Sequence, residues 1–278
     1  VGTNCGLFGK NACIEVDGAA YWMSENGFFT YDGQLQSMPC LVEDYVYDSI
    51  NDTSRDLINC GLNNLFGEIN WFYPSEASDE VDRVVTYNYL DSSAKQPIWT
   101  TGSLARTAWQ DSAVFNRPHA TYYGSNDNAS FDVTGNTQGS TIYYNQETGT
   151  DQVTAGNIAV AIPAFIESGD FDITQKRSNT GQAVGTPDLR GDGEYIMRIS
   201  RFIPDFITQT GDTKVTFTTR AYPNSTPATK EFTINSSKTF QSTRIRARSV
   251  ALKISNTAVN QDWKLGTFRL DIAPGGLR

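Results

Sequence analysis

Hydrophobic and polar residues alternate along much of this chain, which is the period of a β-strand with one buried face. The clearest alternation runs from Arg83 to Tyr89. It belongs to a series of four short aromatic segments, each closed by a turn cluster, at residues 68–75, 83–89, 97–102 and 106–109. Four strands at this spacing predict one antiparallel sheet, the size of one blade of a β-propeller.

A second group of strands precedes this one. Residues 20–24 and 28–31 flank a turn at Glu25-Asn-Gly27, and a third strand follows within 34–41. We expect Trp22 and Phe28 to pack on one face of this sheet.

One segment has a helical rather than a strand pattern. At the start of residues 43–65, the apolar residues Val42, Val46 and Ile50 recur at helical spacing. The segment predicts one or two short helices that link two blades.

The remaining pattern completes an all-β prediction of propeller-like antiparallel blades. Blades fill residues 1–175, with the helical insert near 43–65, and polar hairpins interrupt 125–139. A flexible loop is expected at 176–193, because that stretch is rich in Gly, Asn and Thr. Residues 194–278 alternate most regularly and predict a C-terminal antiparallel β region that closes the fold.

Three arginines near the end of the chain form a candidate subunit interface. Arg244, Arg246 and Arg248 lie at i, i+2 and i+4, so one strand would direct all three to the same face. Their mutual repulsion requires neutralisation by carboxylates, phosphates or solvent. A neighbouring subunit or sheet that supplies acids and a solvated edge are both open interpretations.

The net charge of −9 is distributed unevenly. Residues 1–93 hold 15 acidic and 3 basic side chains, whereas residues 244–278 hold 7 basic and 2 acidic ones. This argues against nonspecific wrapping of nucleic acid by the whole surface. It fits repulsion of passing DNA, subunits that meet head to tail, or simply solvated loops. Four acidic residues lie close together in one turn, at Glu76, Asp79, Glu80 and Asp82. This acidic turn could face a channel, a partner or water.

Catalytic chemistry has few candidates. His119 is the one histidine and follows Pro118 in a turn-rich stretch, and no nucleophile, phosphate-loop or dinucleotide motif appears. A glycosidase site could combine Glu68, Asp79 and Asp82 with nearby aromatic residues Trp71 and Tyr73. The Asp box of sialidase propellers is absent, so we expect no enzyme, no cofactor and no metal.

Cysteines and chain ends give weaker information. Cys5, Cys13, Cys40 and Cys60 are spaced irregularly, which favours free thiols in a reducing compartment, although four cysteines leave disulfides possible. No secretory signal and no apolar run of membrane-spanning length is apparent. The chain starts at Val1, and we expect it to be the C-terminal piece of a longer polypeptide.

A family resemblance covers nearly the whole chain in one collinear order. The segments that carry it are Trp22, Phe28–Gly33, Pro39-Cys40, Asp44–Val46, Glu68–Ser75, Asp82–Tyr89, Trp99–Gly102, Leu104–Trp109, Ile142–Tyr144, Glu147–Gly149, Ala164–Gly169, Ile203–Asp205, Thr243–Arg248, Asp262–Gly266, Arg269–Asp271 and Gly276–Arg278. Together they resemble the tail nozzle proteins of short-tailed bacteriophages, also called packaged-DNA stabilisation proteins. Members of that family are usually much longer, and the hairpins at 125–139 and the loop at 176–193 look like elaborations.

The resemblance implies a structural virion protein without catalytic residues. Such a subunit is propeller-like and forms a homohexameric ring below the portal and adaptor proteins. The ring extends and closes the DNA channel, retains the packaged genome and conducts it at ejection without sequence-specific binding. Tail fibres or spikes attach nearby, and the ring is assembled in the host cytoplasm and resides in the virion tail. The alternative function is a carbohydrate-binding or glycan-hydrolysing propeller used in host attachment.

Overall fold

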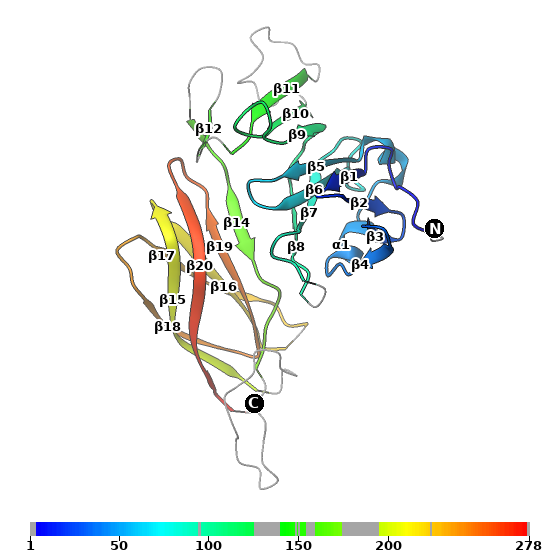
Figure 1. Ribbon diagram of the computed structural model, residues 1–278. Coiled ribbons are helices and arrows are strands. Elements are labelled where there is room, and N and C mark those ends of the chain that lie inside the picture. Colours follow the sequence, from blue (N-terminus) through cyan, green and yellow to red (C-terminus); the bar gives the residue numbers. More distant parts are fainter. Residues whose placement is uncertain are drawn as a thin grey trace. The chain divides into compact units, whose positions relative to one another are not determined.

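The computed structural model describes residues 4–93, 96–124, 140–147, 149, 151–153, 159–173, 195–222 and 224–276 (Figure 1). Strands make up 55% of the structure and helices 5%, and all sheets are antiparallel, which confirms the all-β class. The chain forms two compact units, Val1–Thr148 and Gly149–Arg278. Each unit is described by itself.

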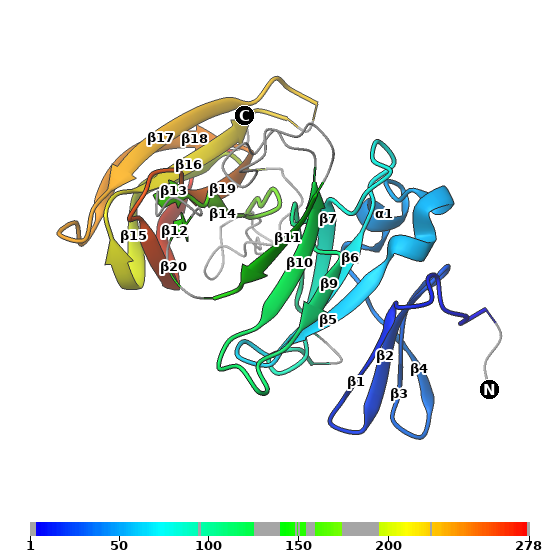
Figure 2. The same ribbon diagram turned by 90° about the horizontal axis from the view of Figure 1, so that it is seen from above.

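The first sheet is a four-stranded meander in which each strand pairs with the next along the chain (Figure 2). Its strands are β1 (Cys13–Val16), β2 (Ala19–Ser24), β3 (Gly27–Tyr31) and β4 (Leu35–Met38). The predicted hairpin is confirmed, but the predicted shared face is wrong. Trp22 pairs with Phe29 and stacks on it, whereas Phe28 pairs with Met23 and points into the core.

The second sheet repeats this meander and contains three of the four predicted aromatic strands. Its strands are β5 (Asn59–Asn63), β6 (Glu68–Tyr73), β7 (Arg83–Asn88) and β8 (Trp99–Gly102). The fourth member was wrongly predicted, because β5 comes before the aromatic series and residues 106–109 do not join this sheet. The segment 59–63 had been assigned to the helical insert.

Two short helices precede β5, as the pattern predicted. They are α1 (Glu43–Tyr47) and the 3-10 helix η1 (Asp52–Leu57). Val46 of α1 is fully buried in the core that α1 shares with the first two sheets. The side chain of Asn51 caps η1, because its oxygen accepts hydrogen bonds from the backbone N–H groups of Thr53 and Ser54.

A third sheet lies beside the second. It has the order β11-β10-β9 and consists of β9 (Ala108–Gln110), β10 (His119–Gly124) and β11 (Ser140–Asn145). Trp109 of β9 stacks on Phe72 with ring centres 5.7 Å apart, and its indole N–H donates to the Leu62 carbonyl at 2.7 Å. Position 61 must be glycine for this packing, because a Cβ there would come within 2.4 Å of the Trp109 ring.

Aromatic rings fill the core between the first two sheets. Trp71 is completely buried and lies 5.1 Å from the Phe28 ring and 6.0 Å from the Trp99 ring. Its indole N–H donates to the carbonyl of Ala12 at 3.0 Å, so a polar group is satisfied inside the core. The aromatic series of the sequence is therefore mainly core.

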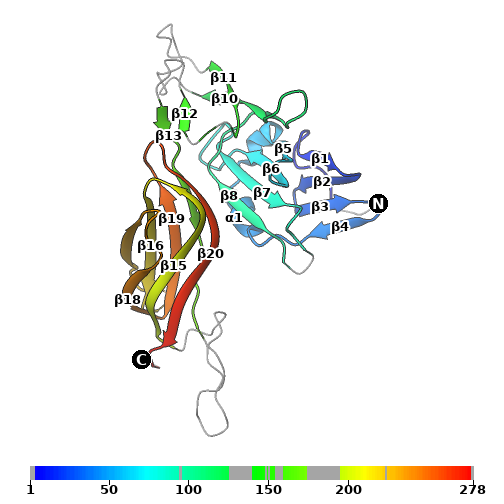
Figure 3. The same ribbon diagram turned by 60° about the vertical axis from the view of Figure 1, so that its left-hand side comes forward.

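The second unit is built from two sheets with a common core (Figure 3). One sheet has the order β14-β19-β16-β17 and consists of β14 (Ala164–Glu167), β16 (Thr213–Arg220), β17 (Ala228–Ile234) and β19 (Ser249–Asn256). The other sheet has the order β18-β15-β20 and consists of β15 (Met197–Thr210), β18 (Gln241–Ala247) and β20 (Asp262–Pro274). Phe202 of β15 and Phe217 of β16 meet 5.2 Å apart in this core. A small hairpin of β12 (Asp151–Val153) and β13 (Ala159–Ala161) belongs to the same unit.

Two features of the second unit are not evident from the alternation of residues 194–278. Residues 244–255 belong to two strands, because the chain changes sheet between β18 and β19. β15 continues through Pro204 to Thr210. β18 pairs with β15 only from Met197 to Phe202, so a proline at 204 interrupts no ladder with β18.

The predicted domain limits can be compared with the two units only in part. β14 pairs with β19 and so belongs to the second unit, although it precedes residue 175. The hairpins predicted at 125–139 and the loop predicted at 176–193 lie outside the described residues.

Replacing Trp71 with alanine tests whether the aromatic cluster holds the first unit together. We expect the free energy of unfolding to fall by about 3–5 kcal/mol, because the change removes buried ring contacts and leaves a cavity. Urea denaturation followed by circular dichroism measures this. Leu41→Ala is the control, since Leu41 is 81% exposed and should change stability by no more than about 0.5 kcal/mol. If Trp71→Ala lowered the free energy of unfolding as little as Leu41→Ala does, the aromatic cluster would not be the main source of stability of the first unit.

Candidate interaction surfaces

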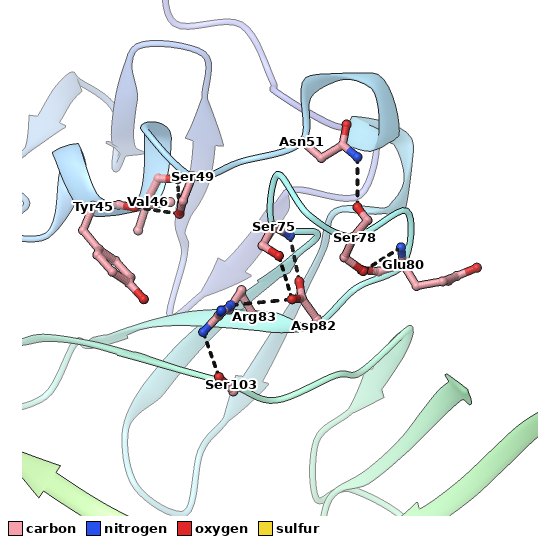
Figure 4. Close-up of polar contacts among 10 residues, drawn as sticks. All are labelled: Tyr45, Val46, Ser49, Asn51, Ser75, Ser78, Glu80, Asp82, Arg83 and Ser103. Carbon is pink, nitrogen blue, oxygen red and sulfur yellow. Dashed lines mark hydrogen bonds and ion pairs between the residues drawn. The ribbon is translucent and has the colours of Figure 1, made fainter. Parts of the chain in front are cut away.

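The acidic turn between β6 and β7 is a loop held by several hydrogen bonds (Figure 4). Asn51 donates from its side-chain amide to the Ser78 carbonyl at 2.9 Å, and the Glu76 N–H donates to the Ser49 carbonyl at 2.7 Å. The Ser78 hydroxyl donates to the Glu80 carbonyl at 2.7 Å. These bonds tie the loop to the segment that connects α1 and η1.

Asp82 has a structural role that separates it from the other acids of the loop. Its carboxylate accepts hydrogen bonds from the Ser75 N–H and the Ser75 hydroxyl, both at 2.7 Å, and lies 3.6 Å from the Arg83 guanidinium. Glu76, Asp79 and Glu80 are exposed. Figure 4 shows the Glu80 carboxylate pointing away from the other labelled residues. The acidic loop is therefore defined as Glu76, Asp79 and Glu80.

The arginine surface lies on the outward face of the β18-β15-β20 sheet. Arg244 and Arg246 are exposed, while the alternating residues Ile245 and Ala247 are buried in the core. Arg198 of β15 is exposed and lies directly opposite Arg246 in the strand register. The sequence pattern does not indicate Arg198, because this residue lies 48 positions before Arg246 in the chain. Only the pairing of β15 with β18 brings the two side by side.

A concavity of about 380 Å³ opens among these side chains. Its lining combines Arg198, Arg244 and Arg246 with Ile245 and the end of β20 at residues 273–275. The Arg246 guanidinium donates to the Gly275 carbonyl at 3.4 Å. The lining contains no carboxylate, and no ion pair among the described residues involves these three arginines. We name this feature the arginine pocket.

Arg248 is not part of the pocket lining. β18 ends at Ala247, and Arg248 lies at the bend where the chain passes into the other sheet. Its backbone N–H donates to the Arg220 carbonyl at 3.0 Å, and its side chain is half-buried. The three arginines predicted to share one strand face are therefore two strand residues and one residue of the connection.

The carboxylates weighed for a glycosidase site do not converge. Glu68 and Asp82 lie at opposite ends of β6, which at the rise of a strand separates them by roughly 17 Å. Asp79 lies in the loop at the Asp82 end. Trp71 and Tyr73 are buried in the core and cannot stack on a sugar. The paired carboxyl groups of glycosidases stand within about 5–9.5 Å of each other.

Glu68 instead faces another acid. Burial raises the pKa of its carboxyl, and the nearby Glu147 carboxylate raises it further. The side-chain amide of Asn63 donates to Glu147 at 3.3 Å. Two carboxyl groups near each other in a partly buried place favour the protonated form of Glu68.

His119 belongs to a small ring cluster on the third sheet. Its Nδ1 shares a hydrogen bond with the Tyr143 hydroxyl, and its ring lies 4.4 Å from the Phe115 ring. No disulfide joins the four cysteines, all of which lie in described segments. Within the described part of the chain, no group of three or more His, Cys, Asp or Glu side chains is placed to hold a metal ion.

The two compact units have opposite net charge. Residues 1–148 carry 19 acidic and 6 basic side chains, a net charge of −13, and residues 149–278 carry 12 acidic and 16 basic ones, a net charge of +4. The acidic loop lies in the first unit and the arginine pocket in the second. The uneven charge seen in the sequence thus follows the division of the fold.

Comparison with known proteins adds no assignment. No protein-family profile matches the chain, and no curated protein matches it. None of the helices in the described segments is both long enough and apolar enough to span a membrane.

Removing the Asp82 carboxylate tests its structural role. We expect Asp82→Ala to lower the free energy of unfolding by about 1–3 kcal/mol, because two hydrogen bonds to a charged group are lost. Urea titration measures the change. Glu80→Ala, in the same loop, should stay within about 0.5 kcal/mol of the wild type. A loss of the same size in both variants would contradict the distinction between them.

The raised pKa of Glu68 predicts that the free energy of unfolding depends on pH. Its folded-state pKa is raised, so its favourable contribution is present below the unfolded pKa of about 4.3 and is lost as the pH rises through the folded value. We therefore expect Glu68→Gln to raise the free energy of unfolding at pH 7 and to change it little at pH 4. Urea titrations at the two pH values test this, with Asp56→Asn as an exposed control. An equal effect at both pH values would contradict it.

Proposed function

We propose that the chain is a structural subunit of the tail nozzle of a short-tailed bacteriophage. Copies form a homohexameric ring that extends and closes the DNA channel, retains the packaged genome and conducts it at ejection. Its partners are other copies of itself, the portal and adaptor proteins, and tail fibres or spikes. It acts in the virion tail after assembly in the host cytoplasm.

The observation that carries this proposal is the division of charge between two separately packed units. A unit of net charge −13 and a unit of net charge +4 in one chain attract opposite units of other copies. A contact between different surfaces is heterologous, and repetition of such a contact closes a ring when the rotation permits. Charge of both signs on one subunit thus supports head-to-tail assembly.

The acidic first unit also suits a channel wall. DNA that passes a negatively charged surface is repelled rather than retained by it. A wall of this kind would let DNA slide during ejection without sequence-specific contacts. Retention then depends on closure of the channel and not on binding to the phosphate backbone.

The strand order of the first unit supports the propeller-like part of the proposal. β1–β4 and β5–β8 are both four-stranded meanders with consecutive strands paired, which is the arrangement within a propeller blade. They pack on each other through aromatic residues. A longer chain could add further blades to these two.

Assembly in solution tests the proposal. We expect the purified chain to form closed rings with six-fold symmetry in negative-stain electron microscopy, and mass photometry to give six times the single-chain mass. Because the attraction is electrostatic, assembly should weaken between about 0.05 M and 0.5 M NaCl, where the screening length falls.

A chain that remains monomeric at low salt would overturn the nozzle proposal. Binding to glycans by such a monomer, measured on a glycan array, would favour the carbohydrate-binding alternative. Rings that persist unchanged in high salt would retain the assembly but contradict its electrostatic origin.

A further inference from the structure

We infer that the arginine pocket is a carboxylate-binding site, and that its ligand is the acidic loop of a second copy of this chain. The inference rests on the proposed function, because it names the contact that would join neighbouring subunits. It assigns Arg198, which the sequence pattern did not single out, to that contact. It also excludes Asp82 from the contact, since Asp82 is engaged within its own loop.

The pocket lacks the neutralisation that its neighbours on the same sheet have. Arg201 pairs with Asp271 at 2.7 Å, and Arg269 pairs with Asp205 at 3.3 Å. Among the described residues no such partner exists for the three pocket arginines. Like charges directly opposite each other destabilise a sheet, and Arg198 faces Arg246 in this way. Negative charge from outside would relieve this repulsion.

The acidic loop offers negative charge in a fixed geometry. Glu76, Asp79 and Glu80 are exposed, and no ion pair among the described residues involves them. The Asn51 amide and the Ser78 hydroxyl donate hydrogen bonds to the loop backbone, and the Asp82 carboxylate accepts one from the Ser75 N–H. A loop whose backbone is restrained by such bonds loses less conformational entropy on binding than an unrestrained one.

The chemistry of the two surfaces is complementary. Guanidinium groups bind carboxylates through paired, charge-assisted hydrogen bonds, which set orientation as well as attraction. The concavity of about 380 Å³ can admit protruding side chains, and residues 273–275 form its wall on the side of β20. The acidic loop of a second copy supplies three exposed carboxylates, opposite in charge to the three guanidinium groups of the pocket.

Charge reversal on each side tests the contact. We expect Arg246→Glu and Glu80→Arg each to weaken association of the chain by about tenfold or more at low salt, because each places like charges together. Sedimentation velocity over a concentration series measures the association, and circular dichroism checks that each variant remains folded.

Mixing the two variants distinguishes a direct contact from a general charge effect. In an alternating assembly, the native loop of the Arg246→Glu copy meets the native pocket of the other copy. The reversed loop of the Glu80→Arg copy then meets the reversed pocket. We expect an equimolar mixture to recover most of the wild-type association, although neither variant associates well alone.

Matched controls carry the same charge changes elsewhere. Lys264→Glu lies on β20 far from the pocket end of that strand, and Asp56→Arg lies on the exposed side of η1 in the first unit. Both should associate within about twofold of the wild type, since surface charges beyond a screening length are weakly coupled. Effects equal to those of Arg246→Glu and Glu80→Arg would overturn the inference.

The outcomes also separate this inference from the proposed function. Rings that form unchanged in both pocket and loop variants would overturn the inference and leave the nozzle proposal in place. Copies that associate through the pocket without forming rings would retain the inference and overturn the nozzle proposal. Binding of inorganic phosphate or duplex DNA that Arg246→Glu abolishes, with association unaffected, would show that the pocket takes phosphate groups and would overturn the inference. A wild-type chain that is monomeric at low salt overturns both.

Discussion

The first unit depends on the burial of Trp71 between two meander sheets. Its ring contacts Phe28 of the first sheet and Trp99 of β8, an edge strand of the second sheet, to which Trp71 itself belongs. Its N–H donates a hydrogen bond to the Ala12 carbonyl. An indole buried without a partner would lose a hydrogen bond that water provides. The bond to Ala12 therefore lets the indole ring be buried at the centre of the cluster that the first two sheets share.

The strands of this fold could be predicted from period and turn residues, but their sheet membership could not. β5 escaped notice because its buried residues include Asn59 and Asn63, whose polarity hides the alternation. Their amide nitrogens donate to groups far along the chain, the Arg106 carbonyl and the Glu147 carboxylate, while their side-chain oxygens are buried without a partner among the described residues. Such partners are a property of the folded chain, so a local pattern gives no sign that an asparagine can be buried there.

The candidate site shows the same limit. Alternation along β18 correctly predicted that Arg244 and Arg246 face one way, since strand geometry is local. Register is not local, and it alone brings Arg198 opposite Arg246. The chain also changes sheet after Ala247, which removes Arg248 from the row. Asp82 was grouped with the other acids for a similar reason, because its two bonds to Ser75 depend on how the loop closes.

The charge of the units and the chemistry of the pocket act at different distances. Net charges of −13 and +4 can orient approaching copies, but salt at physiological strength screens exposed charges beyond about 8 Å. Orientation by itself would leave many registers of nearly equal energy. In the proposed contact, the three guanidinium groups of the pocket would favour the registers that bring carboxylates into hydrogen-bond range, because charge-assisted hydrogen bonds depend on orientation. The proposed assembly would therefore combine long-range attraction with a short-range contact.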